Sequence, residues 1–190
     1  DYWGKPVPSF GDPFARLLIM GLAPGAHGSN RTGRMFTGDA SGNVLFKSLH
    51  RAGFANKEIA SSLEDGLLLT DCRISAIAHC APPGNKPSNE ELENCGEWLD
   101  QELQLMLSQL TVVVALGRMA FKGYLKSLKR MGFAFSSPTP KFGHGAYYKL
   151  DNGLPNLLCS YHPSQQNVLT GRLTQEMLDD VFYFARGTLK

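Results

Sequence analysis

Short apolar runs alternate with amphipathic stretches along the whole chain. The runs at 16–20 (RLLIM), 111–116 (TVVVAL) and 156–161 (NLLCSY) have the length and composition of buried strands. A further strand is expected within 67–79, where an apolar start gives way to alternation. The pattern therefore predicts four strands, with polar or amphipathic segments between them.

The segments between the strands carry apolar residues at steps of three and four, which is typical of helices with one buried face. Ser41 is a candidate N-cap for the first helix, and 88–91 (SNEE) has the spacing of a capping box. Residues 142–150 are expected to form a short hairpin or an irregular lobe. The helices are expected at about 41–52, 89–110, 118–129 and 174–186.

Strands separated by helices predict a three-layer α/β/α domain with a central, mostly parallel four-stranded sheet. A chain of 190 residues suits one such domain, so we expect 1–190 to be a single unit. Ligands of parallel sheets bind beyond the carboxyl ends of the strands. Polar loops at 21–42, 80–87 and 162–172 follow three of the predicted strands. We expect these loops to border one crevice.

The first loop, GLAPGAHGSNRTGRMFTGDASG, contains six glycines but only one carboxylate, Asp39, and one phenyl ring, Phe36. Glycine lets the backbone bend tightly and approach a ligand closely. The loop matches neither the P-loop pattern nor the G-x-G-x-x-G dinucleotide pattern. Taken alone, it is also compatible with a plain strand-to-helix connection, in which Asp39 caps the following helix alongside Ser41.

The other two loops add groups suited to a planar, anionic ligand. His162 follows a predicted strand directly and precedes a proline, which stiffens its position. Asn85 offers a donor and an acceptor on one planar amide, as the edge of a pyrimidine requires, although it also suits a simple turn. Arg172, after a threonine and a glycine, is a candidate phosphate contact.

Composition narrows the class of protein further. The formal net charge of +2 does not exclude a local nucleic-acid-binding surface. The chain contains no apolar run near the roughly 20 residues of a membrane span. Its four cysteines are widely spaced, so we expect reduced thiols and an intracellular protein rather than a disulfide scaffold. Because the sequence begins with Asp, we also expect that an N-terminal segment is missing.

Together the three loops resemble the motifs of the uracil-DNA glycosylase superfamily, most closely those of its fifth, broad-specificity bacterial and archaeal family. The segments concerned are GLAPGAHGSNRTGRMFTGDASG, CAPPGNKP and YHPSQQNVLTGRLT, and the resemblance runs from about residue 2 to 186. It implies a monofunctional DNA glycosylase that turns uracil out of DNA and hydrolyses the N-glycosidic bond. An abasic site is left behind.

The resemblance also implies roles for individual residues. Asp39 and His162 are the expected catalytic pair, with Asp39 steadying the cationic sugar or orienting the water. The base is expected to meet Leu22, Ala23, Phe36 and Asn85. The expected DNA contacts are Arg31, Arg34, Lys86, Gln165, Gln166, Asn167 and Arg172. Many relatives carry a polar residue where this chain has Ala23, so we expect a broader range of deaminated bases, including hypoxanthine.

Families four and five of this superfamily hold a structural 4Fe-4S cluster on four cysteines. Cys80 and Cys95 match two of these ligands, and the other two are expected in the missing N-terminal segment. Cys95 also fits an ordinary core position in its helix. Cys72 and Cys159 lie in predicted strands and are expected to be buried thiols. No cofactor is expected to be required for the chemistry.

Two other classes of function stay open at this point. A nucleic-acid-binding module without catalysis would keep the loops but would not need Asp39 or His162. A hydrolase acting on a free nucleoside or nucleotide would lack the steep salt dependence of DNA binding. The expected partner is DNA containing uracil or another deaminated base, met by a monomer that has no membrane partner and works in the cytoplasm, near the nucleoid.

Overall fold

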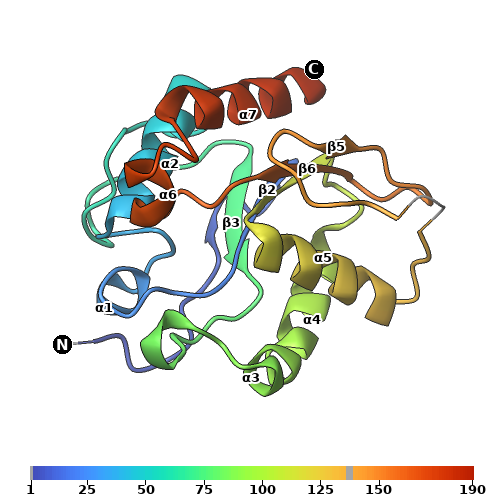
Figure 1. Cartoon of the computed structure of the whole chain (residues 1–190), viewed down its shortest axis with the longest axis horizontal. Coiled ribbons are helices and arrows are strands. Elements are labelled where there is room, and N and C mark those ends of the chain that lie inside the picture. Colours follow the sequence, from blue (N-terminus) through green and yellow to red (C-terminus); the bar gives the residue numbers. More distant parts are fainter. Residues whose placement is uncertain (1, 136–138) are drawn as a thin grey trace.

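A computed structural model describes residues 2–135 and 139–190. A central sheet lies between two layers of helices (Figure 1). In order across the sheet, the strands are β1 (Phe10–Gly11), β3 (Cys72–Ala76), β2 (Leu17–Gly21), β4 (Val112–Leu116), β6 (Asn156–Ser160) and β5 (Tyr147–Tyr148). The three-layer α/β/α prediction is confirmed.

The predicted number of four strands was wrong, because the sheet has six within the residues that the structure describes. The four inner strands, β3, β2, β4 and β6, pair in parallel as expected. The two added strands are two residues long and pair antiparallel at the two edges. So short a strand contains no period of apolar and polar residues, and the sequence pattern cannot reveal it.

The helices, in chain order, are α1 (Ser29–Thr32), α2 (Ala40–Arg51), the 3₁₀ turn η1 (Pro83–Asn85), α3 (Asn89–Asn94), α4 (Gly96–Met106), α5 (Arg118–Arg130), α6 (Gln165–Leu169) and α7 (Gln175–Thr188). The capping box at Ser88 and Glu91 is present as predicted. The long helix predicted at 89–110 is instead divided into α3 and α4, which meet at Cys95. The predicted lobe at 142–150 includes β5.

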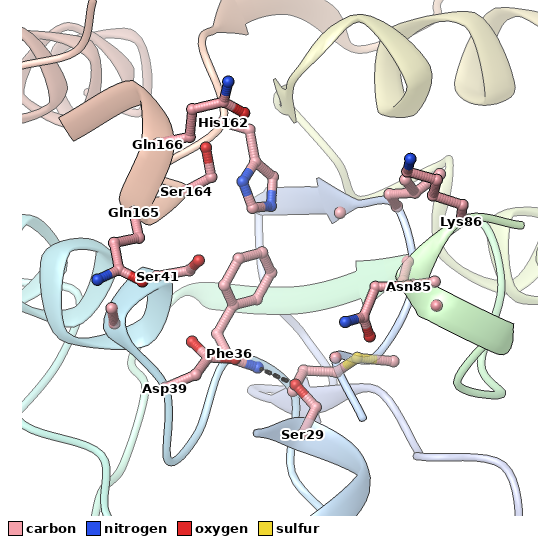
Figure 2. A pocket seen from close by; sticks show the side chains of 18 residues that line it. Ser29, Phe36, Asp39, Ser41, Asn85, Lys86, His162, Ser164, Gln165 and Gln166 are labelled. Atoms are coloured by element: carbon pink, nitrogen blue, oxygen red, sulfur yellow. Dashed lines mark hydrogen bonds between the residues drawn. The ribbon is translucent and has the colours of Figure 1, made fainter. Parts of the chain in front are cut away.

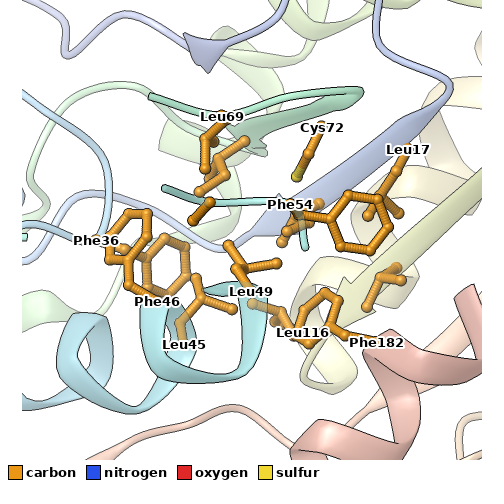
Figure 3. Close-up of a cluster of buried hydrophobic side chains, with 14 of the residues drawn as sticks. Leu17, Phe36, Leu45, Phe46, Leu49, Phe54, Leu69, Cys72, Leu116 and Phe182 are labelled. Carbon is orange, nitrogen blue, oxygen red and sulfur yellow. The ribbon is translucent and has the colours of Figure 1, made fainter. Parts of the chain in front are cut away.

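Alternation along the inner strands separates two hydrophobic cores, one on each face of the sheet. Leu17 and Ile19 of β2 pack on the face that also buries side chains of α2 and α7. Leu18 and Met20 face the core that is built with α4 and α5. Figure 3 shows part of the first core, where Phe46, Phe54 and other aromatic rings pack with leucines. With both faces covered, the loops at the carboxyl edge of the sheet are left to form a site.

Candidate active site

A cavity of about 550 Å³ lies at the carboxyl edge of the sheet. Loops that follow β2, β3 and β6 contribute its walls, as the sequence analysis predicted. The predicted site residues that line it are Leu22, Ala23, Phe36, Asp39, Asn85, Lys86, His162, Gln165 and Gln166. The fold thus brings both predicted catalytic residues and all four predicted base-binding residues to one cavity.

The Phe36 ring forms one wall of this cavity and is fixed by its backbone. Phe36 has a φ of +53°, and its N–H donates to Ser29 Oγ at 2.9 Å. A Cβ on Gly21 would stand 3.1 Å from the Phe36 ring, so glycine at the end of β2 makes room for it. The ring centroid lies 5.9 Å from that of His162 (Figure 2). The result is a flat, rigid apolar surface beside an imidazole.

Asp39 begins α2 and also faces the cavity. Its Oδ1 accepts the N–H of Gly42 at 2.9 Å, which makes it the N-cap of the helix. The prediction that Ser41 caps this helix was wrong, because Ser41 lies in the first turn. The other carboxylate oxygen, Oδ2, packs against Gly25 and Gly28, where added Cβ atoms would stand 3.5 Å and 2.1 Å away. One oxygen therefore holds the helix and the other lies among glycines.

His162 lies two residues beyond the end of β6, with its ring at the cavity. Burial lowers the pKa of His162 below its ordinary value, and the negative charge of Asp39 opposes this effect. A lowered pKa favours the neutral imidazole, which carries one N–H to donate. In the view of Figure 2, Asp39 and Asn85 lie on either side of the Phe36 ring, and His162 lies beyond it.

Asn85 joins the second loop to the first. It adopts a φ of +56°, and its Oδ1 accepts the N–H of Ala26 at 2.9 Å. An amide oxygen has two lone pairs and the amide nitrogen two N–H groups, so this bond leaves the side chain able to read a base edge. The hydrogen bond also fixes the plane of the amide relative to the glycine-rich loop.

The predicted DNA contacts divide into exposed and internally engaged side chains. Lys86, Gln165 and Gln166 are exposed at the rim of the cavity. Arg172 is exposed, with its guanidinium 4.7 Å from the centroid of the Tyr161 ring. Lys86, Gln165 and Gln166 therefore border the opening of the cavity, whereas Arg172 does not line it.

Three of the predicted contacts have internal partners. The prediction that Arg34 contacts DNA was wrong, because Arg34 is 2% exposed and forms a bidentate ion pair with Asp65. Arg31 is exposed but donates to backbone carbonyls of its own loop. The Asn167 side chain donates to the carbonyl of His162 at 2.8 Å. The sequence gives no sign of the partner of Arg34, because Asp65 lies 31 residues away.

Sequence reasoning missed the serines that build the cavity. Ser29 fixes Phe36, and Ser164 caps α6 by accepting the N–H of Asn167. A serine directly after a proline and before a polar run is a common helix start, so the sequence did contain a signal for α6. The role of Ser29 depends on a contact across seven residues, which no local pattern indicates.

The cysteines lie away from this cavity. Cys80 is exposed and Cys95 half-buried, and both line a second cavity of about 520 Å³ that also borders Pro6 and Pro8. Burial raises the pKa of Cys95. Cys72 and Cys159 are buried as predicted, and burial raises the pKa of Cys159 to about 11. Within residues 2–135 and 139–190, no cluster of three or more metal-binding side chains is present.

Over the residues that the structure describes, none of the helices is long and apolar enough to cross a bilayer.

Comparison with known proteins identifies the class. The profile of the "Uracil DNA glycosylase superfamily" matches residues 8–185. The chain therefore belongs to the uracil-DNA glycosylase superfamily.

Individual relatives are similar over nearly the whole chain. A "Type-5 uracil-DNA glycosylase" of Mycobacterium tuberculosis is 50% identical over 185 residues, which cover 97% of this chain and 67% of that protein. A "Type-5 uracil-DNA glycosylase" of Thermus thermophilus is also 50% identical over 185 residues, which cover 97% of this chain and 81% of that protein. A "Type-5 uracil-DNA glycosylase" of Pyrobaculum aerophilum is 46% identical over 180 residues, which cover 95% of this chain and 75% of that protein. Within the superfamily, the chain groups with these type-5 proteins.

Proposed function

We propose that this protein is a DNA repair glycosylase that turns uracil out of DNA and hydrolyses its N-glycosidic bond. The observation that carries the proposal is the cavity in which Phe36, Asn85, His162 and Asp39 meet. An enzyme that acts on a base must remove it from the stack and hold it in a close pocket. The names of the type-5 relatives agree with this substrate.

In this proposal the extruded base stacks on Phe36. Stacking of a base on an aromatic ring contributes about 1–3 kcal/mol. Asn85 reads the edge of the base, and the backbone near Leu22 and Ala23, which also line the cavity, faces a carbonyl of the base. The Phe36 ring and the Asn85 amide need little rearrangement when the base arrives. Hydrogen bonds with Ser29 and Ala26 already hold these two residues.

Bond cleavage then needs stabilisation of two opposite charges. The base leaves with the electron pair of the bond to C1′ and becomes an anion, while the deoxyribose becomes cation-like. The neutral His162 donates a hydrogen bond to the carbonyl oxygen where the negative charge gathers. Asp39 faces the sugar with its free oxygen, and a water adds its hydroxide to C1′ as its proton passes to the carboxylate.

The test is release of base from a duplex that contains one uracil. We expect free uracil and an alkali-labile abasic site, with no release from the matched thymine duplex. Affinity for the duplex is expected to fall steeply as salt rises, since phosphate contacts release counterions. Binding without release would favour the non-catalytic module. Cleavage of free deoxyuridine with little salt dependence would favour a nucleoside hydrolase.

We also propose that the protein releases more than one kind of deaminated base. Ala23 lines the cavity with a small apolar side chain, which leaves space and imposes no polar requirement. We expect release of hypoxanthine as well as uracil from duplexes in the same assay. Cleavage of uracil alone would contradict this breadth.

A structural 4Fe-4S cluster is the proposed cofactor, with Cys80 and Cys95 as two of its ligands. Their thiolates suit such a cluster, and both line one cavity beside the N-terminal stretch that contains Pro6 and Pro8. Two thiols cannot enclose a cluster, so the proposal requires two further ligands besides Cys80 and Cys95. No step of the chemistry passes through it.

The cluster predicts brown protein with visible absorbance when the protein is prepared with all four ligands. Cys80→Ala and Cys95→Ala are expected to lower the iron content and the midpoint of thermal unfolding. Cys159→Ala is the matched control, because Cys159 is buried in β6. Colourless protein with no bound iron would contradict the proposal.

We further infer that the protein works as a monomer, because the cavity already contains both proposed catalytic residues and all four proposed base-binding residues. The proposed DNA substrate implies work in the cytoplasm, beside the nucleoid.

A further inference from the structure

The turn that carries His162 is fixed by hydrogen bonds outside the cavity. The N–H of Gly117 donates to the carbonyl of Ser160 at 2.8 Å, and the side chain of Asn167 donates to the carbonyl of His162. A Cβ on Gly117 would stand 3.3 Å from the Cβ of His162, so the backbone after β4 packs closely on this histidine. These contacts hold the residues on both sides of Tyr161.

A second histidine binds Tyr161 itself. Nδ1 of His144 accepts the backbone N–H of Tyr161 at 3.2 Å. The imidazole also stacks on the Tyr161 ring, with centroids 5.1 Å apart and planes at 27°. Because a backbone N–H can only donate, this contact requires that Nδ1 carry no proton. The bond therefore exists only for neutral His144.

The surroundings of His144 keep it neutral at neutral pH. Burial lowers its pKa, while a hydrogen bond with the backbone of Met177 and the charge of Asp180, both in α7, act in the opposite direction. On the side of β6, the ring meets the hydroxyl of Ser160 at 3.5 Å and the Tyr161 ring. The positive charge of Arg172 lies against that same tyrosine ring.

We propose that His144 is a positioning residue for base release, which fixes the backbone before His162 by accepting the Tyr161 N–H. The proposal depends on the proposed function, since His162 is its target. Protonation of His144 places an N–H against the N–H of Tyr161, which breaks the bond and frees the turn. His144 itself does not line the cavity, so it acts through its neighbours.

The sign of the pH dependence follows from this contact. The neutral form of His144 is the active form, so its contribution is present at neutral pH and is lost as the pH falls through its lowered pKa. In His144→Asn, the amide oxygen can still accept the N–H of Tyr161, and it does not titrate over the pH range in which His144 does. A phenylalanine keeps a ring for stacking and removes the acceptor.

The experiment compares His144→Phe, His144→Asn and wild type in single-turnover release of uracil at saturating enzyme. Since small misplacements of a reacting group are costly, His144→Phe is expected to be about tenfold slower at neutral pH. His144→Asn is expected to stay near the wild-type rate and to lose activity at lower pH than wild type. His50→Phe, an exposed change at the end of α2, is the matched control.

Two outcomes would overturn the proposal: equal rates for His144→Phe and wild type, or superimposable pH profiles for His144→Asn and wild type. Thermal unfolding separates a general loss of fold from a local effect. Hydrogen exchange of the Tyr161 amide tests the contact without any activity. It is expected to quicken in His144→Phe and much less in His144→Asn. If wild type releases no base, the proposed function fails, while the exchange result still decides whether His144 holds this turn.

Discussion

Asp39→Asn is expected to slow single-turnover release of uracil by about a hundredfold while leaving DNA binding and stability nearly unchanged, because a positioned general base typically contributes at least this much. Asparagine is as good an N-cap as aspartate, so the bond to the N–H of Gly42 is retained. In the proposed reaction, this substitution removes the negative charge that faces the sugar and the group that takes the proton of the water. Rapid-quench measurement of the abasic product gives the rate.

Asp39→Ala separates the two roles of this carboxylate. It removes the cap as well as the charge, so it is expected to lower the free energy of unfolding by about 1 kcal/mol in addition to slowing the reaction. If Asp39→Asn released base at the wild-type rate, the carboxylate would act only as a cap. Water activation would then belong to another group in the cavity.

Arg34→Met is expected to lower the free energy of unfolding by about 3 kcal/mol, because loss of one partner leaves a carboxylate buried without its counter-charge. The guanidinium donates to both oxygens of Asp65, at 2.9 Å and 2.6 Å, and its Nε donates to Thr37. The ion pair thus supports the turn that holds Phe36 in the cavity. Urea unfolding measures the change, and base release is expected to fall with it.

The same pair makes stability depend on pH. Burial alone raises the pKa of Asp65, but hydrogen bonds from Arg34 and from the N–H groups of Leu67 and Ser61 outweigh it and hold the pKa well below its usual range. A carboxylate with a lowered pKa stabilises the fold above its unfolded pKa, and this contribution is lost as the pH falls. Arg34→Met is therefore expected to show a shallower loss of stability in acid.

Arg31→Met is the matched control, since Arg31 lies in the same loop and is exposed. It is expected to change stability much less. A DNA-binding role for Arg34 predicts the opposite pattern, in which Arg34→Met leaves stability intact and flattens the salt dependence of binding. That pattern would contradict the structural role assigned to the buried pair.

The parts of the fold in which apolar residues follow a clear pattern along the chain were predictable from the sequence. Strands such as Val112–Leu116 are uninterrupted apolar runs, and the loops after β2, β3 and β6 contain the residues that meet in the cavity. A topological rule, that ligands bind at the carboxyl edge, then joined segments far apart in the chain. Phe36, Asp39 and His162 were found in this way.

What could not be predicted depends on long-range contacts. The burial of Arg34 requires Asp65, 31 residues away, and an arginine in a glycine-rich loop otherwise looks exposed. The sequence did not show that Asp39 rather than Ser41 caps α2, because both residues are good N-caps and lie only two positions apart. His144 is separated from Tyr161 by β5 and β6, so no local pattern points to their bond.

The position of Gly28 limits which side chains residues 28 and 39 can carry together. A side chain as small as a methyl group at residue 28 would overlap Oδ2 of Asp39, so the glycine and the aspartate constrain each other. The carboxylate is anchored by a helix on one side and confined by bare backbone on the other. In the proposed reaction this confinement is a form of preorganisation, because a carboxylate that is already fixed need not reorganise to stabilise a short-lived cation.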